Sequence, residues 1–326
     1  DRDYDNAGYL DEYDSESLVV KADSNTKLNN KFSFGYGFEY KYDWVSFENR
    51  GSYSASTKGH MKDFGFFANA GYRINKNQTL SMYGRTDDHN TTRRNQTYKL
   101  NFIQIFGKFK FGATHSTGLR NPSLYELYGS DNYGIEGNTK LNPEKRETKE
   151  LYGEYNFSET IKFTSTGYRT KVFDRIETNA AYSRHENMLT NINQEGLENE
   201  LLFSGNNRNI GLYTIFSKSR KANGQAQARR PDLSYGANYS KKIYSSIYGP
   251  FHLNLNYKHT GQFIDYDGSK NSRQKSTDLV DLSIKKNWFG NILSIDLTNL
   301  LNERYEKPAT YSQDGRRLKV GFRRTY

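Results

Sequence analysis

The sequence predicts an all-β protein, an antiparallel transmembrane β-barrel, from three observations: a hydrophobic period of two residues, connections that alternate in length, and prolines that avoid strands. In the segment 31–42, KFSFGYGFEYKY, every even-numbered residue is aromatic and every odd-numbered residue is glycine, polar or charged. Because successive side chains of a strand point to opposite faces, this segment has one aromatic and one polar face. The same alternation recurs in the segments 251–258, 280–285 and 293–298.

The composition of the polar faces separates two kinds of β-protein. A soluble sandwich packs its apolar faces together, whereas an outer-membrane barrel turns them toward lipid and its polar faces toward the lumen. Here the polar faces are rich in glycine, serine and charge, and 27 Tyr and 20 Phe are too many for a small packed core. A mean hydropathy of -0.96 also fits a barrel, because only half of each strand meets lipid. A secreted, glycan-binding β-protein is the soluble alternative, and solubility without detergent would reveal it.

The predicted connections alternate between short and long, as periplasmic turns and extracellular loops do in membrane barrels. The short ones are 75–78, 157–160, 205–208 and 287–290, and long hydrophilic ones include 119–146, 175–194 and 262–277. A proline cannot donate a hydrogen bond to a sheet ladder. We therefore expect all five prolines to lie in connections, namely Pro122, Pro143, Pro231, Pro250 and Pro308.

The pattern predicts about fifteen strands of roughly ten residues each. They are expected to begin near residues 14, 30, 62, 78, 96, 108, 146, 160, 196, 209, 233, 251, 277, 291 and 316. Bacterial single-chain barrels have an even number of strands with both ends in the periplasm. An odd number therefore predicts that the sequence is the C-terminal part of a longer protein.

Composition excludes several classes of function. The chain has no cysteine, so disulfides, thiolate metal sites and cysteine nucleophiles are excluded. Its six histidines show no HExxH spacing, and no Ser-His-Asp arrangement or glycine-rich phosphate loop is present, so we expect no enzyme. The net charge of +10 suggests nucleic acid or an acidic surface as partner, but no contiguous basic stripe forms. A solvated basic surface, without nucleic acid, is the favoured interpretation.

Five segments carry motifs in a fixed order. RNPSLYELYG at 120–129 is followed by GN at 137–138 and LNPEKRETKE at 141–150. Further along come GYRTKVFDRIETN at 167–179, NINQEGLENELLF at 191–203, ARRPDLSYGANY at 228–239 and LTNLLNERYEKPATYSQDGRRLKVGFRRTY at 297–326. In this order and at this spacing the segments resemble the motifs of TonB-dependent outer-membrane receptors, over nearly the whole chain. GRTDDHN at 84–90 and the acidic, tyrosine-rich start of the chain resemble the cobalamin receptors of that family.

The resemblance implies a receptor of the Gram-negative outer membrane that takes up a bulky, scarce nutrient, cobalamin or a siderophore, with energy from TonB. Residues 1–326 would then be the C-terminal portion of a barrel of 22 strands, with the N-terminal plug and about seven first strands missing. The expected partners are the TonB–ExbB–ExbD complex through that plug, the small-molecule ligand, and outer-membrane lipid and lipopolysaccharide.

Candidate ligand-binding residues lie in two expected extracellular loops. Tyr125, Tyr128 and Tyr133 belong to the longest loop, where rigid aromatic rings could form a floor for a bulky ligand. Belt tyrosines at the membrane interface are the structural alternative, which we favour for Tyr125 and Tyr128 because they belong to the family motif. The resemblance to cobalamin receptors adds Tyr311 and Arg316 of the terminal loop, although a turn with a lumenal cation is the favoured interpretation of Arg316.

The acidic first loop suggests a calcium site. Asp3, Asp5, Asp11 and Asp14 offer the hard oxygen ligands that Ca²⁺ prefers, although their spacing is not that of an EF-hand. A solvated acidic loop is the alternative. No other cofactor is expected.

A passive porin of about sixteen strands is the alternative function, since the length fits. A porin should fold one long loop into its lumen, with an acidic cluster facing basic residues, and the sequence indicates no such loop. With strands missing, the edges at residues 17–22 and 318–326 are expected to stay open rather than to pair with each other.

Overall fold

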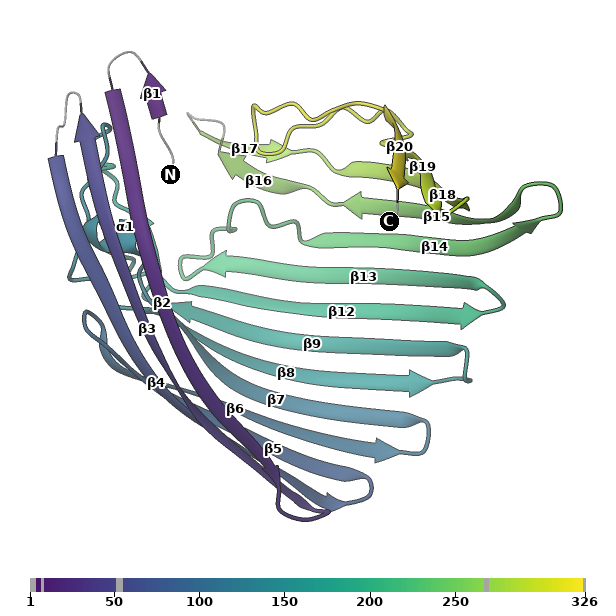
Figure 1. Cartoon of the computed structure of the whole chain (residues 1–326), viewed down its shortest axis with the longest axis horizontal. Helices are drawn as coiled ribbons and strands as arrows, with labels where there is room; N and C mark the ends of the chain where they lie inside the picture. Colours follow the sequence, from purple (N-terminus) through teal and green to yellow (C-terminus); the bar gives the residue numbers. More distant parts are fainter. Residues whose placement is uncertain (1–3, 7–8, 51–54, 267–269, 325–326) are drawn as a thin grey trace. The chain divides into compact units, whose positions relative to one another are not determined.

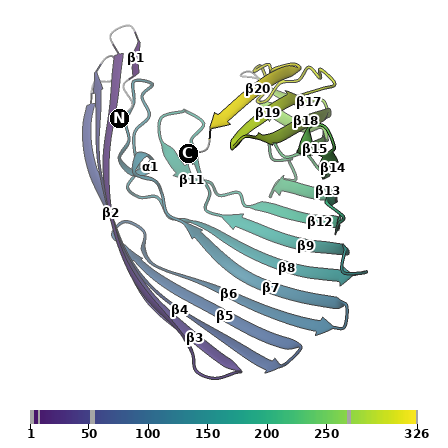
Figure 2. The same cartoon turned by 45° about the vertical axis from the view of Figure 1, so that its right-hand side comes forward.

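Strands make up most of the computed structural model, which describes residues 4–6, 9–50, 55–266 and 270–324 (Figures 1 and 2). The strands are β1 Tyr4–Asn6, β2 Tyr9–Lys27, β3 Phe32–Arg50, β4 Ala55–Asn75, β5 Gln78–His89, β6 Arg93–Phe106, β7 Phe109–Arg120, β8 Glu144–Asn156, β9 Ile161–Phe173, β10 Ile176–Thr178, β11 His185–Asn187, β12 Ile192–Gly205, β13 Arg208–Lys221, β14 Leu233–Ser245, β15 Gly249–Thr260, β16 Phe263–Tyr266, β17 Asn271–Gln274, β18 Thr277–Trp288, β19 Asn291–Thr298 and β20 Arg317–Arg324. One short helix, α1, spans Leu124–Tyr128.

The sheet follows the order of the chain. Within the described ranges, sixteen strands are ordered β1-β2-β3-β4-β5-β6-β7-β8-β9-β12-β13-β14-β15-β18-β19-β20. Apart from the three-residue β1, each of these fifteen strands matches one of the fifteen predicted from the sequence, so that prediction is confirmed. The strand order begins with β1 and ends with β20. The expectation that the edges at residues 17–22 and 318–326 stay open in a membrane stays a prediction.

Two compact units divide the described chain. The first comprises residues 1–104, 112–149 and 170–192, and the second comprises 105–111, 150–169 and 193–326. The first contains β1 to β5, α1 and the small β10–β11 hairpin, and the second contains β13 to β20. Strands β6, β7, β8, β9 and β12 contribute residues to both units.

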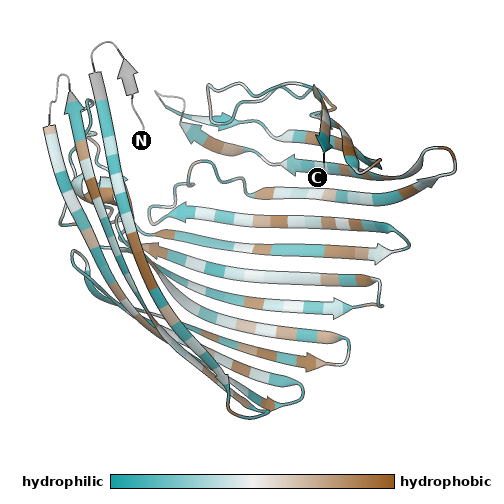
Figure 3. Ribbon diagram, in the orientation of Figure 1, coloured by the Kyte–Doolittle hydropathy of each residue, from teal (hydrophilic) through white to brown (hydrophobic). Residues whose placement is uncertain are grey.

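The predicted alternation of faces is confirmed in the first unit. Cross-strand pairs join even-numbered residues, as in Tyr40↔Phe64 of β3 and β4. The even-numbered Tyr36 is 51% exposed, whereas Gly35 and Gly37 beside it are buried. Figure 3 shows hydrophobic and hydrophilic residues alternating along many of the strands. We call the even-numbered side of β2 to β6 the aromatic face and the odd-numbered side the polar face.

The second unit alternates in the same way. Leu253 and Leu255 of β15 pair with Ile284 and Leu282 of β18, while Asn254 between them pairs with Ser283. Strand β20 presents Leu318, Val320 and Phe322 as large exposed hydrophobic side chains. Each strand therefore offers one apolar and one polar side, which is the pattern that a strand between lipid and a wet lumen requires.

Three strands are longer than predicted. Strands β2, β3 and β4 have 19, 19 and 21 residues, whereas about ten were expected. At about 3.3 Å per residue such strands extend roughly 65 Å, well beyond an apolar band of about 25 Å. Strand β2 consequently includes Asp11 and Asp14, which pair with Asn49 and Ser46 of β3. The prediction of an acidic loop is therefore wrong from residue 9 onward.

The connections differ from the prediction in two respects. Pro250 lies inside β15, where it pairs with Tyr244 of β14, so not all prolines are in connections. It is the second residue of that strand, near the start, where a missing N–H is tolerated best. The long loops also contain structure: α1 in 121–143, the β10–β11 hairpin in 174–191 and the β16–β17 hairpin in 261–276.

Across the described ranges, no helix combines the length and the apolar character needed to cross a membrane.

Candidate functional site

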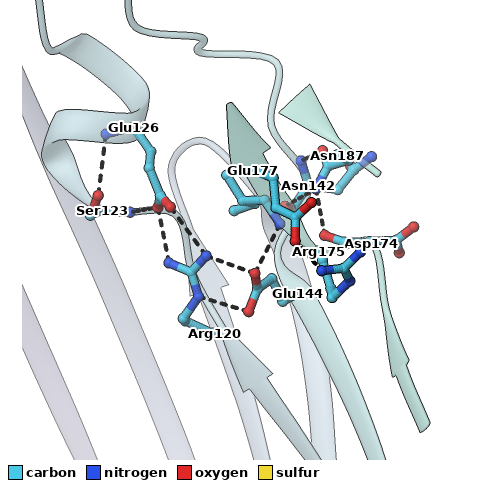
Figure 4. Close-up of polar contacts among 10 residues, drawn as sticks. Arg120, Ser123, Glu126, Asn142, Glu144, Asp174, Arg175, Glu177 and Asn187 are labelled. Atoms are coloured by element: carbon cyan, nitrogen blue, oxygen red, sulfur yellow. Dashed lines mark hydrogen bonds and ion pairs between the residues drawn. The ribbon is translucent and has the colours of Figure 1, made fainter. Parts of the chain in front are cut away.

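The connection between β7 and β8, residues 121–143 and here called the α1 loop, is the candidate site. Pro122 ends the ladder and Ser123 caps the helix: its Oγ accepts a hydrogen bond from the Glu126 N–H at 3.2 Å. In return the Glu126 carboxylate accepts one from the Ser123 N–H at 2.7 Å (Figure 4). This reciprocal capping box satisfies two N–H groups that a helix start leaves unpaired. The sequence therefore starts a helix where the strand stops.

One guanidinium holds both ends of the α1 loop. Arg120, the last residue of β7, donates from Nε and Nη2 to the two oxygens of Glu144, each at 2.8 Å. It also donates from Nη1 and Nη2 to Glu126 at 3.0 and 3.1 Å (Figure 4). Burial raises the pKa of Glu126, but the hydrogen bonds from Arg120 and Ser123 outweigh it and hold the pKa below its usual value. Both carboxylates are therefore ionised acceptors at neutral pH.

The same network attaches the β10–β11 hairpin to the loop. Glu144 Oε1 accepts a hydrogen bond from the Ile176 N–H at 2.8 Å. Asn187 accepts from the Asn142 N–H at 2.7 Å and donates to the Asn142 carbonyl at 2.9 Å (Figure 4). A small apolar core of Leu127, Leu141 and Ile176 fills the space between them. Two loops that are distant in sequence thus form one folded body.

The α1 loop packs on the polar face of β3 and β4, and in Figures 1 and 2 α1 lies beside these strands. The ring of Tyr128 lies so close to Gly59 that a Cβ there would meet the ring at 2.2 Å. The Tyr128 hydroxyl donates to the His60 carbonyl at 3.0 Å. Only glycine permits this approach of a ring to a strand backbone. The α1 loop thus folds back over the polar side of these two strands.

An aromatic cluster attaches the middle of the loop to β2 and β3. The Tyr125 ring makes edge contacts with Tyr13, Phe47 and His185 at centroid distances of 6.2, 5.9 and 5.7 Å. Its hydroxyl donates to Asp131 Oδ2 at 2.6 Å. Burial raises the pKa of Tyr125, with the Asp131 hydrogen bond adding to the shift. Tyr125 is thus a neutral hydrogen-bond donor that holds the loop in place.

The candidate ligand residues have different surroundings. Tyr125 and Tyr128 pack the loop against β2 to β4 rather than forming the interfacial belt that was the favoured interpretation, and their part in ligand binding stays a prediction. Tyr133 is 85% exposed, and only its backbone is held, by a hydrogen bond from its N–H to Asp131 at 2.9 Å. In the second unit Tyr311 is 66% exposed, and Arg316 donates from Nε to the Leu300 carbonyl at 2.9 Å. Of the four candidate tyrosines, Tyr133 and Tyr311 are the two with largely exposed rings, and their role stays a prediction.

The described residues do not assemble the predicted calcium site. Asp11 and Asp14 lie on opposite faces of β2, because their positions differ in parity. Asp11 Oδ1 accepts a hydrogen bond from Asn132 Nδ2 at 2.7 Å, which joins β2 to the α1 loop. Over the described part of the chain, no group of three His, Cys, Asp or Glu side chains could hold a metal ion. Asp3 and the side chain of Asp5 lie outside the described residues, and their part in calcium binding stays a prediction.

Sequence reasoning missed a second polar centre, in the loops of the second unit. Asp265 of β16 has no exposed surface, and it accepts hydrogen bonds from Arg229 Nε at 2.7 Å and from the Ala309 N–H at 2.8 Å. Three connections, 222–232, 261–276 and 299–316, meet at this carboxylate. Burial raises the pKa of Asp265, but the hydrogen bonds from Ala309 and Arg229 lower it further, so the net pKa is lowered. The Arg229 side chain is thus engaged in an ion pair within the loops.

The segment 84–90 forms part of the polar face. Arg85 donates from Nε to Asp87 at 2.7 Å and from Nη2 to Glu39 of β3 at 3.1 Å. Asp43 beside them accepts from the Ser17 hydroxyl at 2.6 Å and pairs with Lys41 at 2.7 Å. Opposite charges thus compensate one another across β2 to β5, which suits a wall facing water.

Comparisons with known proteins agree with this geometry. The family model described as TonB dependent receptor-like, beta-barrel matches residues 1–300. The vitamin B12 transporter BtuB of Vibrio cholerae is 25% identical over 260 residues, which cover 78% of this chain and 39% of that protein. The chain therefore spans well under half of this curated relative.

Solved structures share the fold. The siderophore receptor PirA of Acinetobacter baumannii superimposes with a TM-score of 0.79 at 15% identity, covering 97% of this chain and 55% of that one. The ferripyoverdine receptor of Pseudomonas aeruginosa gives a TM-score of 0.77 at 13% identity, covering 97% and 48%. With the family model matching nearly the whole length, the chain belongs to the TonB-dependent receptor-like β-barrel family.

Proposed function

We propose that this chain forms barrel wall and extracellular binding surface in a receptor of the Gram-negative outer membrane that takes up a bulky, scarce nutrient. The nutrient is cobalamin or a siderophore, and the energy comes from TonB. Family membership supports the receptor class. The vitamin B12 transporter of Vibrio cholerae and the siderophore receptors supply the two ligand classes.

The observation that carries the proposal is the α1 loop, folded and attached to the polar face. Arg120 joins its two ends, Tyr125 and Tyr128 dock it on β3 and β4, and Tyr133 remains exposed at its turn. A loop held in one conformation loses little entropy when a ligand binds. Such a loop supports tight binding better than a mobile loop of the same composition would.

The strands have a separate role in the proposal. Their aromatic face meets outer-membrane lipid and lipopolysaccharide, and their polar face lines the lumen. A barrel of this family is wide enough to leak unless a plug fills it. We propose that the plug, in the part of the receptor outside this chain, receives the pull of the TonB–ExbB–ExbD complex and releases the bound ligand inward.

A binding experiment tests the receptor class. Cells that produce the full protein as encoded are incubated with radiolabelled cobalamin and, separately, with a radiolabelled ferric siderophore. We expect saturable binding of one of the two at nanomolar concentration, weakened severalfold by Tyr133→Ala. The matched control is Tyr248→Ala, a tyrosine that is 71% exposed in the short turn between β14 and β15. Association that rises linearly with concentration for both compounds would contradict the proposal and favour the passive pore.

A further inference from the structure

A cleft in the second unit gathers five cationic side chains. It has a volume of about 340 Å³ and lies between the ends of β15 and β18, strand β17 and residues 303–307 of the terminal loop. Its cations are Lys258, Arg273, Lys275, Arg304 and Lys307, and all five are exposed. We call this the basic cleft. Its volume is within the range of small-molecule sites.

The basic cleft opens on the polar side of its strands. Lys258 and Thr260 of β15 line it, together with their cross-strand partners Leu279 and Thr277 of β18. Tyr257, adjacent to Lys258, belongs to the opposite, apolar side. Because that apolar side is the one suited to lipid, the cleft faces water and not the hydrocarbon. Its occupant is therefore reached from water, not from the hydrocarbon of the membrane.

The charges of the basic cleft are not compensated. Five cations stand against two carboxylates, Glu303 and Glu306, which leaves a net charge of +3. Glu306 already accepts a hydrogen bond from the Thr310 N–H at 2.7 Å. Among the described residues, none of the five cations forms an ion pair within 4.0 Å.

Three arginines close in sequence to the cleft residues form ion pairs. Arg220 pairs with Asp232 at 2.8 Å and Arg229 with Asp265 at 2.7 Å, and Arg317 pairs with Asp314. The two arginines of the basic cleft, Arg273 and Arg304, have no such partner among the described residues. Like charges gathered in a concave surface repel one another and raise the local potential, and a multivalent anion relieves that repulsion.

We propose that the basic cleft is a subsite for a multivalent oxyanion, a group of carboxylates or phosphates on the transported molecule. Arginine binds such groups with two parallel hydrogen bonds, and the hydroxyls of Thr260, Thr277 and Tyr305 add neutral donors at the same wall. The inference rests on the proposed function and narrows its ligand to an anionic nutrient. The carrier of the charge is the soluble nutrient, and lipopolysaccharide phosphate is the competing source that the test separates.

The test measures anion binding directly and needs no transport. The full protein, purified from outer membranes in detergent, is titrated calorimetrically with citrate and with inorganic phosphate at about 20 mM and about 500 mM salt. The Debye screening length shortens from about 20 Å to about 4 Å across this range, so anion binding should weaken strongly as salt is added. The double variant Arg273→Glu/Lys275→Glu should lose at least tenfold in citrate affinity, equivalent to about 1.4 kcal/mol.

Controls make each outcome decisive. Arg230→Glu reverses an exposed arginine of the same unit outside the cleft and should leave citrate affinity unchanged. If charge reversal prevents folding, Arg273→Gln/Lys275→Gln replaces it and should lose affinity in the same direction. Equal citrate affinity in the cleft variants and the unmodified protein would overturn the inference. So would binding of lipopolysaccharide, but not citrate, that depends on the same residues. Citrate binding without nutrient uptake in cells would support the cleft and contradict the proposed function.

Discussion

Replacing Arg120 by methionine should release the α1 loop without disturbing the sheet. The substitution leaves the carboxylates of Glu126 and Glu144 facing each other, with side chains only 13% and 21% exposed. Hydrogen bonds to charged groups contribute about 1.5–3 kcal/mol each. The Arg120 side chain is itself 45% exposed, so solvent screens part of this contribution. We expect the docked loop to lose about 2–3 kcal/mol relative to its open form.

Hydrogen exchange measures that loss locally. A loss of this size makes the amides of residues 121–143 exchange about 30- to 140-fold faster, since each 1.4 kcal/mol is a factor of ten. Arg94→Met, at an exposed position of β6, is the matched control and should change nothing in the loop. Adding Glu126→Gln to Arg120→Met should restore part of the protection, because it removes one of the two facing charges. Unchanged exchange in Arg120→Met would refute the reasoning.

Three other predictions concern the faces, the second unit and calcium. Tyr36→Arg on the aromatic face should destabilise the membrane-inserted protein by ~2–4 kcal/mol, and Asn69→Arg on the polar face by much less. Urea unfolding from lipid measures both losses, and equal losses would contradict a membrane barrel. The pKa of Asp265 is lowered in the folded protein, so the ionised Asp265 stabilises the folded loops above the unfolded pKa of about 3.9. That stabilisation is lost as pH falls through the folded pKa, where protease nicking of residues 261–276 should rise. Asp265→Asn should make the nicking insensitive to pH. If the start of the chain holds Ca²⁺, replacing Asp3 and Asp5 by asparagine should abolish a Ca²⁺-dependent gain in ligand affinity. The site would be excluded if the ligand affinity of the unmodified receptor were the same with and without Ca²⁺.

Local periodicity was sufficient to predict the strands. A period of two residues indicates where a strand lies and which side chains share a face, as the Tyr40↔Phe64 pair confirms. It does not indicate how far a strand continues once its residues leave the membrane. Strand β2 continues through Asp11 and Asp14 because β3 offers backbone partners there, and acidic composition alone favoured a loop.

The docking of the loops could not be predicted because it depends on contacts between distant residues. Tyr128 fits over Gly59, 69 positions earlier in the chain, and no local pattern relates the two. Asp265 in the segment FIDY had one available signal, a single carboxylate between apolar residues, which is typical of a buried acceptor. The capping box also has a local signal, a serine at 123 followed three residues later by Glu126.

Energised uptake is the central claim, and one measurement tests it most directly. Cells that produce the full protein are given its radiolabelled ligand, and internal label is followed over time in otherwise identical strains with and without TonB. The account predicts equal surface binding in both strains, and accumulation above the external concentration only where TonB is present. Equal accumulation in the two strains, limited to the external concentration, would contradict the account and identify a passive pore.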